Sequence, residues 1–166
     1  MYTRLYEHLL NLDSVDLVGL IDIFAGKIIH SNFSSDFEGK FLLSLGLIYR
    51  TRSCKSYLMF LLRVFLGIRN IARAFKGRDR FLYEDGIILS HKSSHYVIED
   101  QNKHRDVILG RTQGAYTFES KYGSATEAGG CVIVKVDQFV AVVVTVRENF
   151  SRNSVLEDVL QMCSKV

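Results

Sequence analysis

The chain has 166 residues, of which 48% are apolar and 23% are charged, with a net charge of +3, so its composition excludes a disordered chain and predicts one globular domain. The longest apolar stretch, 57–68, is too short for a membrane-spanning helix and is interrupted by Arg63. The three cysteines, at 54, 131 and 163, have no C-x-x-C spacing, which argues against a disulfide framework or a zinc site and predicts a reducing compartment.

The N-terminal region predicts a helix followed by a β-hairpin. Large apolar side chains recur at helical spacing over 2–11, which is typical of a short amphipathic helix. Val15–Phe24 then alternates imperfectly, and Lys27–Ser31 resumes an extended pattern after the turn signal Ala25-Gly26. Two such runs around a short turn predict a hairpin.

Helical signals follow the hairpin. Ser35-x-x-Glu38 fits a capping box and precedes the apolar run Phe41–Tyr49. We expect a second helix over 55–76, ended by Gly77, because glycine readily adopts the left-handed backbone conformation that stops a helix.

The pattern changes to strands after this helical region. Short segments rich in β-branched residues are predicted as strands at Gly86–Ser90, His95–Glu99, Asp106–Arg111 and Tyr116–Glu119. Lys121–Gly129 is polar and rich in Gly, Ser and Thr, which predicts an exposed loop.

The strongest strand signals lie near the C-terminus. Gly130–Val136 and Phe139–Val146 consist mostly of Val, Ile and Ala, and the two residues between them fit a tight turn. Val142–Val144 is apolar on both faces, which predicts a central strand. Ser154-x-x-Glu157 is expected to cap a last helix through Met162. The order predicts an α+β domain in which terminal helices cover one face of an antiparallel meander.

Basic residues are concentrated in one segment. Between Arg50 and Arg80 there are nine Lys or Arg and one acid, whereas the remainder holds 12 basic and 17 acidic residues. Such a segment indicates an acidic partner, either an acidic protein face or anionic lipid, or else a solvated helix face. Nucleic acid is not expected, because the aromatic residues are not interleaved with the basic ones. Four basic residues would share one helix face if the helix continues: Arg69, Arg73, Lys76 and Arg80.

No catalytic or metal-binding pattern stands out. The serines lack a G-x-S-x-G elbow, and no phosphate-binding or dinucleotide-binding loop is present. His91 and His95 are four apart in a segment that predicts strand–turn–strand, where that spacing does not place both rings on one face. We therefore expect a binding protein with no cofactor and no bound metal rather than an enzyme.

The order of elements and several local strings resemble the profilin family. The resemblance covers 1–32 and 86–166, apart from 112–129. The strings that carry it are Tyr6–Asp16, Ala25–His30, Gly86–Ile98, Arg105–Arg111 and Gly130–Gln138. It implies one profilin-like domain over 1–166 with further helices on the second face of the sheet, and insertions at about 33–85 and 112–129.

Membership of the profilin family would imply a monomeric protein of the cytoplasm and cytoskeleton that binds actin monomers and regulates polymerisation. The planar guanidinium group of arginine can donate two parallel hydrogen bonds to a carboxylate of a partner. Carried over by position, the candidate actin-binding residues are Lys92, Arg105, Arg111, Lys135, Arg152 and Asn153, with Arg147 as a further choice.

Profilins also bind proline-rich peptides between their terminal helices, through stacked aromatic rings. The candidates here are Tyr2, Tyr6, His30 and Phe33. The chain has no tryptophan, and His30 occupies the position where profilins usually carry one. We therefore expect binding of proline-rich peptides to be weak or lost.

Two other functions remain open from the sequence. Profilins bind phosphoinositides through basic patches, so the basic residues from Arg69 to Arg80 predict a site for anionic lipid, which could be the main function of the module. A roadblock or longin-type module that dimerises and regulates small GTPases would have a similar order of elements. The pair of terminal helices on one sheet face favours the profilin reading.

Overall fold

The computed structural model describes residues 2–32, 64–77, 80–87, 89, 96–101, 106–112 and 128–165. The predicted segments around 35–49 and 116–119 lie outside these residues, as do Lys92, Arg105 and Phe33. Within the described part, no helix is long and apolar enough to cross a membrane.

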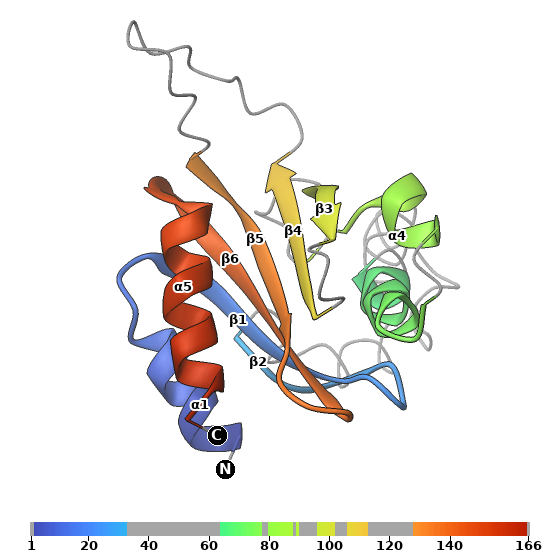
Figure 1. The fold of residues 1–166 in the computed structure, drawn as a ribbon, viewed down its shortest axis with the longest axis horizontal. Coiled ribbons are helices and arrows are strands. Elements are labelled where there is room, and N and C mark those ends of the chain that lie inside the picture. The colour runs from blue at the N-terminus through green and yellow to red at the C-terminus, as the bar shows by residue number, and fades with distance from the viewer. Residues whose placement is uncertain are drawn as a thin grey trace, which may run out of the picture.

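One antiparallel sheet forms the centre of the molecule (Figure 1). Its strands are β1 (Val15–Asp22), β2 (Lys27–Ser31), β3 (Tyr96–Gln101), β4 (Val107–Thr112), β5 (Ala128–Lys135) and β6 (Val140–Ser151). They are ordered β2-β1-β6-β5-β4-β3, so β3 to β6 form a meander and β6 also pairs with β1. The predicted α+β meander is confirmed.

Helices cover both faces of the sheet. The terminal helices α1 (Tyr2–Leu10) and α5 (Arg152–Cys163) lie side by side on one face (Figure 1). On the other face are the helical residues 64–74 and the short helix α4 (Arg80–Asp85). We call these the terminal-helix face and the basic face.

Alternation along the strands divides the core in two. Val142 and Val144 of β6 pack with Leu9 and Val159 under the terminal helices, whereas Val143 packs on the basic face with Ile71 and others. All three β6 residues are fully buried. The prediction that Val142–Val144 is covered on both faces is confirmed.

Glycines make the turns where the sequence indicates them. Gly26 has φ +65° in the β1–β2 turn, and Gly77 has φ +79° just after the helical residues 64–74. Both conformations are easily reached only without a Cβ atom. The predicted hairpin turn and helix stop are therefore confirmed.

Several element boundaries differ from the predictions, including that of β5, which begins at Ala128 within the predicted loop Lys121–Gly129. Helix α5 begins at Arg152, with Ser151 and not Ser154 as its N-cap residue, because β6 continues to Ser151 and leads directly into the helix. Of the predicted strand Gly86–Ser90, the structure describes residues 86, 87 and 89, and among these only Ile87 forms a bridge, since Gly86 has φ +64° and closes α4. Helix α4 was not predicted, because six residues are too few to show a period.

Candidate binding surfaces

One group of predicted actin-binding residues lies where β4 ends and α5 begins. Arg111 is exposed near the end of β4. It lies on the terminal-helix face, because alternate residues of a strand share a face and Val107 and Leu109 pack in the core under the terminal helices. Asn153 is exposed in the first turn of α5. These two residues form what we call the α5-start surface.

Arg152 belongs to the same region but is buried, with 9% of its surface exposed. Its side chain packs against Gly130, where an added Cβ would meet Arg152 Cδ at 3.2 Å and the carbonyl oxygen of Gly110 at 2.5 Å. Glycine at 130 thus permits the backbone of β4 and the side chain of Arg152 in α5 to approach the backbone of β5 closely. Because it is buried, Arg152 supports the α5-start surface from beneath.

Lys135 lies elsewhere. It ends β5 on the face of Cys131 and Ile133, which pack in the core of the basic face, and its Nζ is 3.7 Å from the Asp106 carboxylate. Five positions along β5 separate it from Gly130, which is roughly 17 Å. The structure therefore does not bring Lys135 together with Arg111, although both were predicted for one surface.

The predicted proline-rich-peptide residues lie between α1 and the sheet. The rings of Tyr6 and His30 are 5.8 Å apart between centroids and tilted by 34°. Tyr2 and Tyr6 are half-buried and pack against the core under the terminal helices. The Tyr2 hydroxyl donates a hydrogen bond to the carboxylate of Asp137, in the β5–β6 turn. The tyrosines thus already have intramolecular partners.

Asp137 is a residue whose role the sequence reading missed. Its Oδ1 accepts hydrogen bonds from the amides of Phe139 (2.6 Å) and Val140 (2.8 Å), as aspartate commonly does at a turn. The turn chemistry is visible in the sequence, but the bond from Tyr2 joins residues 135 positions apart. Burial opposes ionisation of Asp137, but the hydrogen bond from Tyr2 and those from the two amides outweigh it, so the pKa of Asp137 is lowered. The same hydrogen bond is the main cause of the raised pKa of Tyr2.

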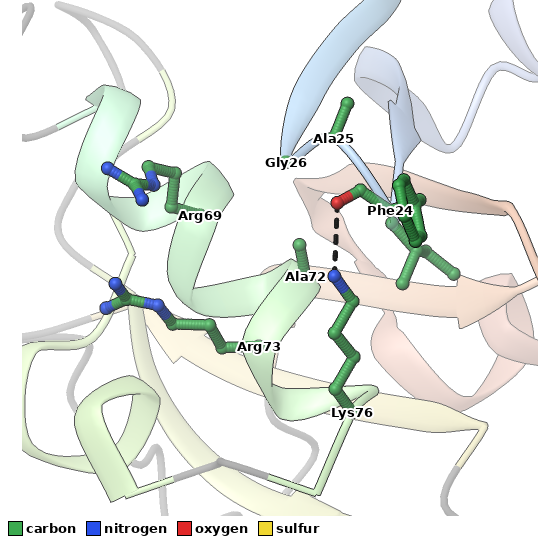
Figure 2. Close-up of a pocket in the computed structure, with 8 residues that line it drawn as sticks. Phe24, Ala25, Gly26, Arg69, Ala72, Arg73 and Lys76 are labelled. Carbon is green, nitrogen blue, oxygen red and sulfur yellow. Dashed lines mark hydrogen bonds between the residues drawn. The ribbon is translucent and has the colours of Figure 1, made fainter.

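The basic face carries a pocket of about 360 Å³ between residues 64–76 and the β1–β2 turn (Figure 2). Arg69, Arg73 and Lys76 line one side, and Ile23 to Gly26 line the other. Lys76 Nζ donates a hydrogen bond to the carbonyl oxygen of Phe24 (3.1 Å) and lies 5.2 Å from the centre of the Phe24 ring. The Arg69 guanidinium lies 5.7 Å from the centre of the Phe65 ring.

Arg80 does not join these three cations. The helical residues end at 74 and Gly77 has φ +79°, so the expected continuous helix face does not extend to Arg80. Arg80 begins α4 and pairs with Glu84 at 2.8 Å, with 82% of its side chain exposed. The four residues were expected to share one face if the helix continued; it ends at 74, so Arg80 belongs to α4 instead.

Comparisons by sequence and by structure give different results. No protein-family model and no curated protein matches the chain by sequence. Among solved structures, Schizosaccharomyces pombe profilin matches with a TM-score of 0.59 at 12% identity, over 99% of this chain and 95% of that chain. The chain has the profilin fold.

Two further profilin structures match over similar lengths. LokiProfilin1, solved in complex with rabbit actin, has a TM-score of 0.55 at 15% identity and covers 98% of this chain and 91% of that chain. Mouse profilin IIa, in complex with a double repeat from the FH1 domain of mDia1, has a TM-score of 0.56 at 11% identity, over 99% and 94%. At this identity the likeness concerns the fold, and it favours the profilin reading over a roadblock or longin module.

Within this profilin fold, the described cysteines are poor nucleophiles. Burial raises the pKa of Cys131 to about 12 and that of Cys163 to about 11, so both thiols are protonated near neutral pH. Among the described residues, no three His, Cys, Asp or Glu side chains are grouped as metal ligands would be. His91 and His95 lie outside this part of the chain.

Proposed function

We propose that this profilin-like chain binds monomeric actin and regulates its polymerisation without catalysing a reaction. The observation that supports this proposal is the match of nearly the whole chain to profilins, one of them solved bound to rabbit actin. Fold alone does not determine function. The local surfaces therefore decide where such a contact is best placed.

The contact proposed for actin is the α5-start surface. Arg111 and Asn153 are exposed there, and Arg147 of β6, which is also exposed, remains a candidate from the sequence. Arg105 and Lys92 remain candidates from the sequence. Guanidinium groups on such a surface pair with carboxylates of a partner, where they mainly accelerate association and fix orientation. Lys135 lies too far along β5 to join Arg111 in one small contact.

Proline-rich peptides are proposed to bind weakly or not at all. Stacking on such peptides needs several free rings and a donor for the peptide carbonyls. Here the Tyr2 hydroxyl already donates to Asp137, and the only ring described beside Tyr6 is the imidazole of His30. Asp137 therefore competes with a peptide for the hydroxyl of Tyr2.

The test of the main proposal is a titration of the protein into labelled actin monomers, combined with a pyrene-actin polymerisation assay. We expect saturable binding in the micromolar range and altered filament growth. No change of signal in either assay, with the protein folded by circular dichroism, would refute actin binding. A monomeric mass in solution is expected, whereas a stable dimer would favour the roadblock or longin alternative.

A second proposed activity is binding of anionic lipid by Arg69, Arg73 and Lys76. The favouring observation is their gathering around one pocket whose described lining includes no carboxylate. Basic residues near an anionic membrane each add about 1 kcal/mol of attraction. Sedimentation with phosphoinositide-containing vesicles tests this activity. A cytoplasmic and cytoskeletal protein, as proposed here, would meet both actin and the inner membrane surface.

A further inference from the structure

Two phenylalanines stand out from the surface of the protein. Phe24, in the β1–β2 turn, is 77% exposed, and Phe139, in the β5–β6 turn, is 61% exposed. Every other large hydrophobic residue that the structure describes as exposed is at most 43% exposed. Neither phenylalanine contributes to the core clusters of the described residues. Both rings remain largely in water in the folded protein, so their apolar surface adds little burial free energy to its stability.

The two turns are neighbours at one end of the sheet. Asp22 of β1 pairs with Val140 of β6, and the amide of Ile23 donates to the carbonyl oxygen of Phe139 at 2.7 Å. Figure 1 shows both turns projecting at the same end of the sheet. Phe24 and Phe139 thus occupy adjoining hairpin tips, which we call the phenylalanine wedge.

The basic pocket adjoins this wedge. Phe24 itself lines the pocket, and Lys76 holds the backbone of the turn through the carbonyl oxygen of Phe24 (Figure 2). The described charges of the two turns and the pocket are Lys27, Arg69, Arg73 and Lys76 against Asp22 and Asp137. Both carboxylates accept hydrogen bonds from amides of their own turns. The net charge beside the wedge is therefore positive.

We propose that the phenylalanine wedge inserts into the interface of an anionic bilayer while the adjoining cations bind its phosphate groups. The wedge rests on the proposed binding of anionic lipid and goes further, because it names an intact bilayer and not a headgroup alone. Aromatic rings prefer the boundary between headgroups and acyl chains, and neighbouring cations add electrostatic attraction.

A bilayer fits this end of the molecule better than a second copy of the chain. A symmetric dimer formed through this end would place two positively charged pockets near each other, and like charges repel. The rings stand at the ends of turns, which suits insertion between lipid headgroups. The charge complementarity with anionic lipid is the observation that selects this occupant.

The first experiment measures sedimentation with vesicles of phosphatidylcholine containing phosphatidylserine. Phe24→Ser combined with Phe139→Ser is expected to weaken binding tenfold or more. Phe150→Ser is the matched control, because Phe150 is exposed near the end of β6, at the opposite end of that strand from Phe139. The control is expected to bind like the unmodified protein. Equal binding of the double variant would refute the wedge and leave lipid binding by the cations standing.

The cations are tested in the same assay. Arg69→Gln with Lys76→Gln should lower binding to anionic vesicles by about fivefold for each charge. Arg80→Gln, which removes a similarly exposed charge on α4, is expected to change it by less than twofold. If the unmodified protein does not bind anionic vesicles at all, the proposed lipid binding fails together with the wedge.

Insertion can be observed directly, because the chain contains no tryptophan. Phe24→Trp should show a blue-shifted emission with anionic vesicles and no shift with soluble inositol hexakisphosphate. Phe150→Trp should show no shift with either. Binding of the soluble phosphate without a vesicle shift would place the site at a free phosphate ligand and overturn insertion. If the double serine variant loses actin affinity and keeps vesicle binding, the wedge belongs to a protein contact instead.

Discussion

The two faces of the sheet use similar residue types in opposite ways. On the terminal-helix face, Tyr2 and Tyr6 are half-buried, and their polar or aromatic partners come from the protein itself. On the basic face, the ring of Phe24 and the side chain of Arg69 are exposed beside a pocket. An aromatic residue thus indicates a binding site only when its neighbours leave its surface free, and substitutions on the two faces of the sheet test this contrast.

The largest expected effect is the loss of stability caused by adding a Cβ atom at Gly130. Gly130→Ala would place a Cβ at 2.5 Å from the Gly110 carbonyl oxygen, at φ +105°. We expect a loss of about 3 kcal/mol or more in the free energy of unfolding, from strain and displaced backbone. Urea unfolding followed by circular dichroism measures it.

Gly77→Ala is the control for that substitution. Gly77 also has a positive φ, of +79°, but no atom lies within 4 Å of its added Cβ. Only the conformational cost of about 1 kcal/mol is expected. Equal losses for the two variants would show that the crowding of β4, β5 and α5 at Gly130 is not significant.

Charge reversal at Arg111 is expected to have the next largest effect. Arg111→Glu should weaken actin binding by about 1–2 kcal/mol, because a carboxylate would then face the acidic partner surface proposed above. Isothermal titration with actin monomers measures the change. Lys135→Glu is the comparison, since Lys135 lies on the other sheet face and beside Asp106. A larger loss from Lys135→Glu would move the actin contact to the opposite end of β5.

Removing the acceptor of Tyr2 should have a smaller effect. Asp137→Asn is expected to cost about 1 kcal/mol of stability, the usual net value of a partly exposed hydrogen bond. The pKa of Tyr2 should fall toward its usual value in absorbance or NMR titrations, because the Asp137 carboxylate no longer raises it. Tyr2→Phe should produce a similar stability loss, and additive losses in the double variant would contradict a direct bond.

The pH dependence of stability follows from the same pair. The pKa of Asp137 is lowered in the folded protein, so its contribution is present above the unfolded value of about 3.9 and is lost as the pH falls through the folded pKa. The pKa of Tyr2 is raised, so its contribution is present below about pH 10 and is lost above it. Asp137→Asn should remove the acid-side dependence and reduce the alkaline one, because burial also raises the pKa of Tyr2.

The smallest effect is expected for the proline-rich-peptide site. The unmodified protein should not be retained on a polyproline column, because Asp137 occupies the Tyr2 hydroxyl and His30 offers a small ring. His30→Trp should produce slight retention by adding a larger stacking surface beside Tyr6. Strong retention of the unmodified protein would show that the terminal-helix face still binds such peptides.

The sequence was most informative where the signal is local. The apolar runs of β5 and β6 and the glycines at 26 and 77 each encode their structure within a few residues. The start of α5 was predicted too late, because Ser154 fits a capping box but the pairing of β6 with β5 determines where the strand ends. Tertiary contacts override the local cap signal there.

Site residues were harder to predict because their grouping depends on register. Arg111 and Lys135 both lie on strands, but only the pairing of Gly110 with Cys131 shows that they face opposite sides near opposite ends. The bond between Tyr2 and Asp137 joins the N-terminal helix to the β5–β6 turn. No spacing in the sequence reports such a contact.

The place of β6 in the sheet has a consequence for how the protein is made. β6 is the last strand along the chain, yet it joins β1 to β5 in the middle of the sheet. The N-terminal hairpin therefore leaves the ribosome long before its principal partner strand does. Until β6 emerges, Val18 and Leu20 lack the strand with which they pair, and the nascent hairpin exposes an unpaired edge. Sheets closed by such distant pairing fold slowly and are prone to aggregate meanwhile. Chaperone capture during translation would protect this hairpin.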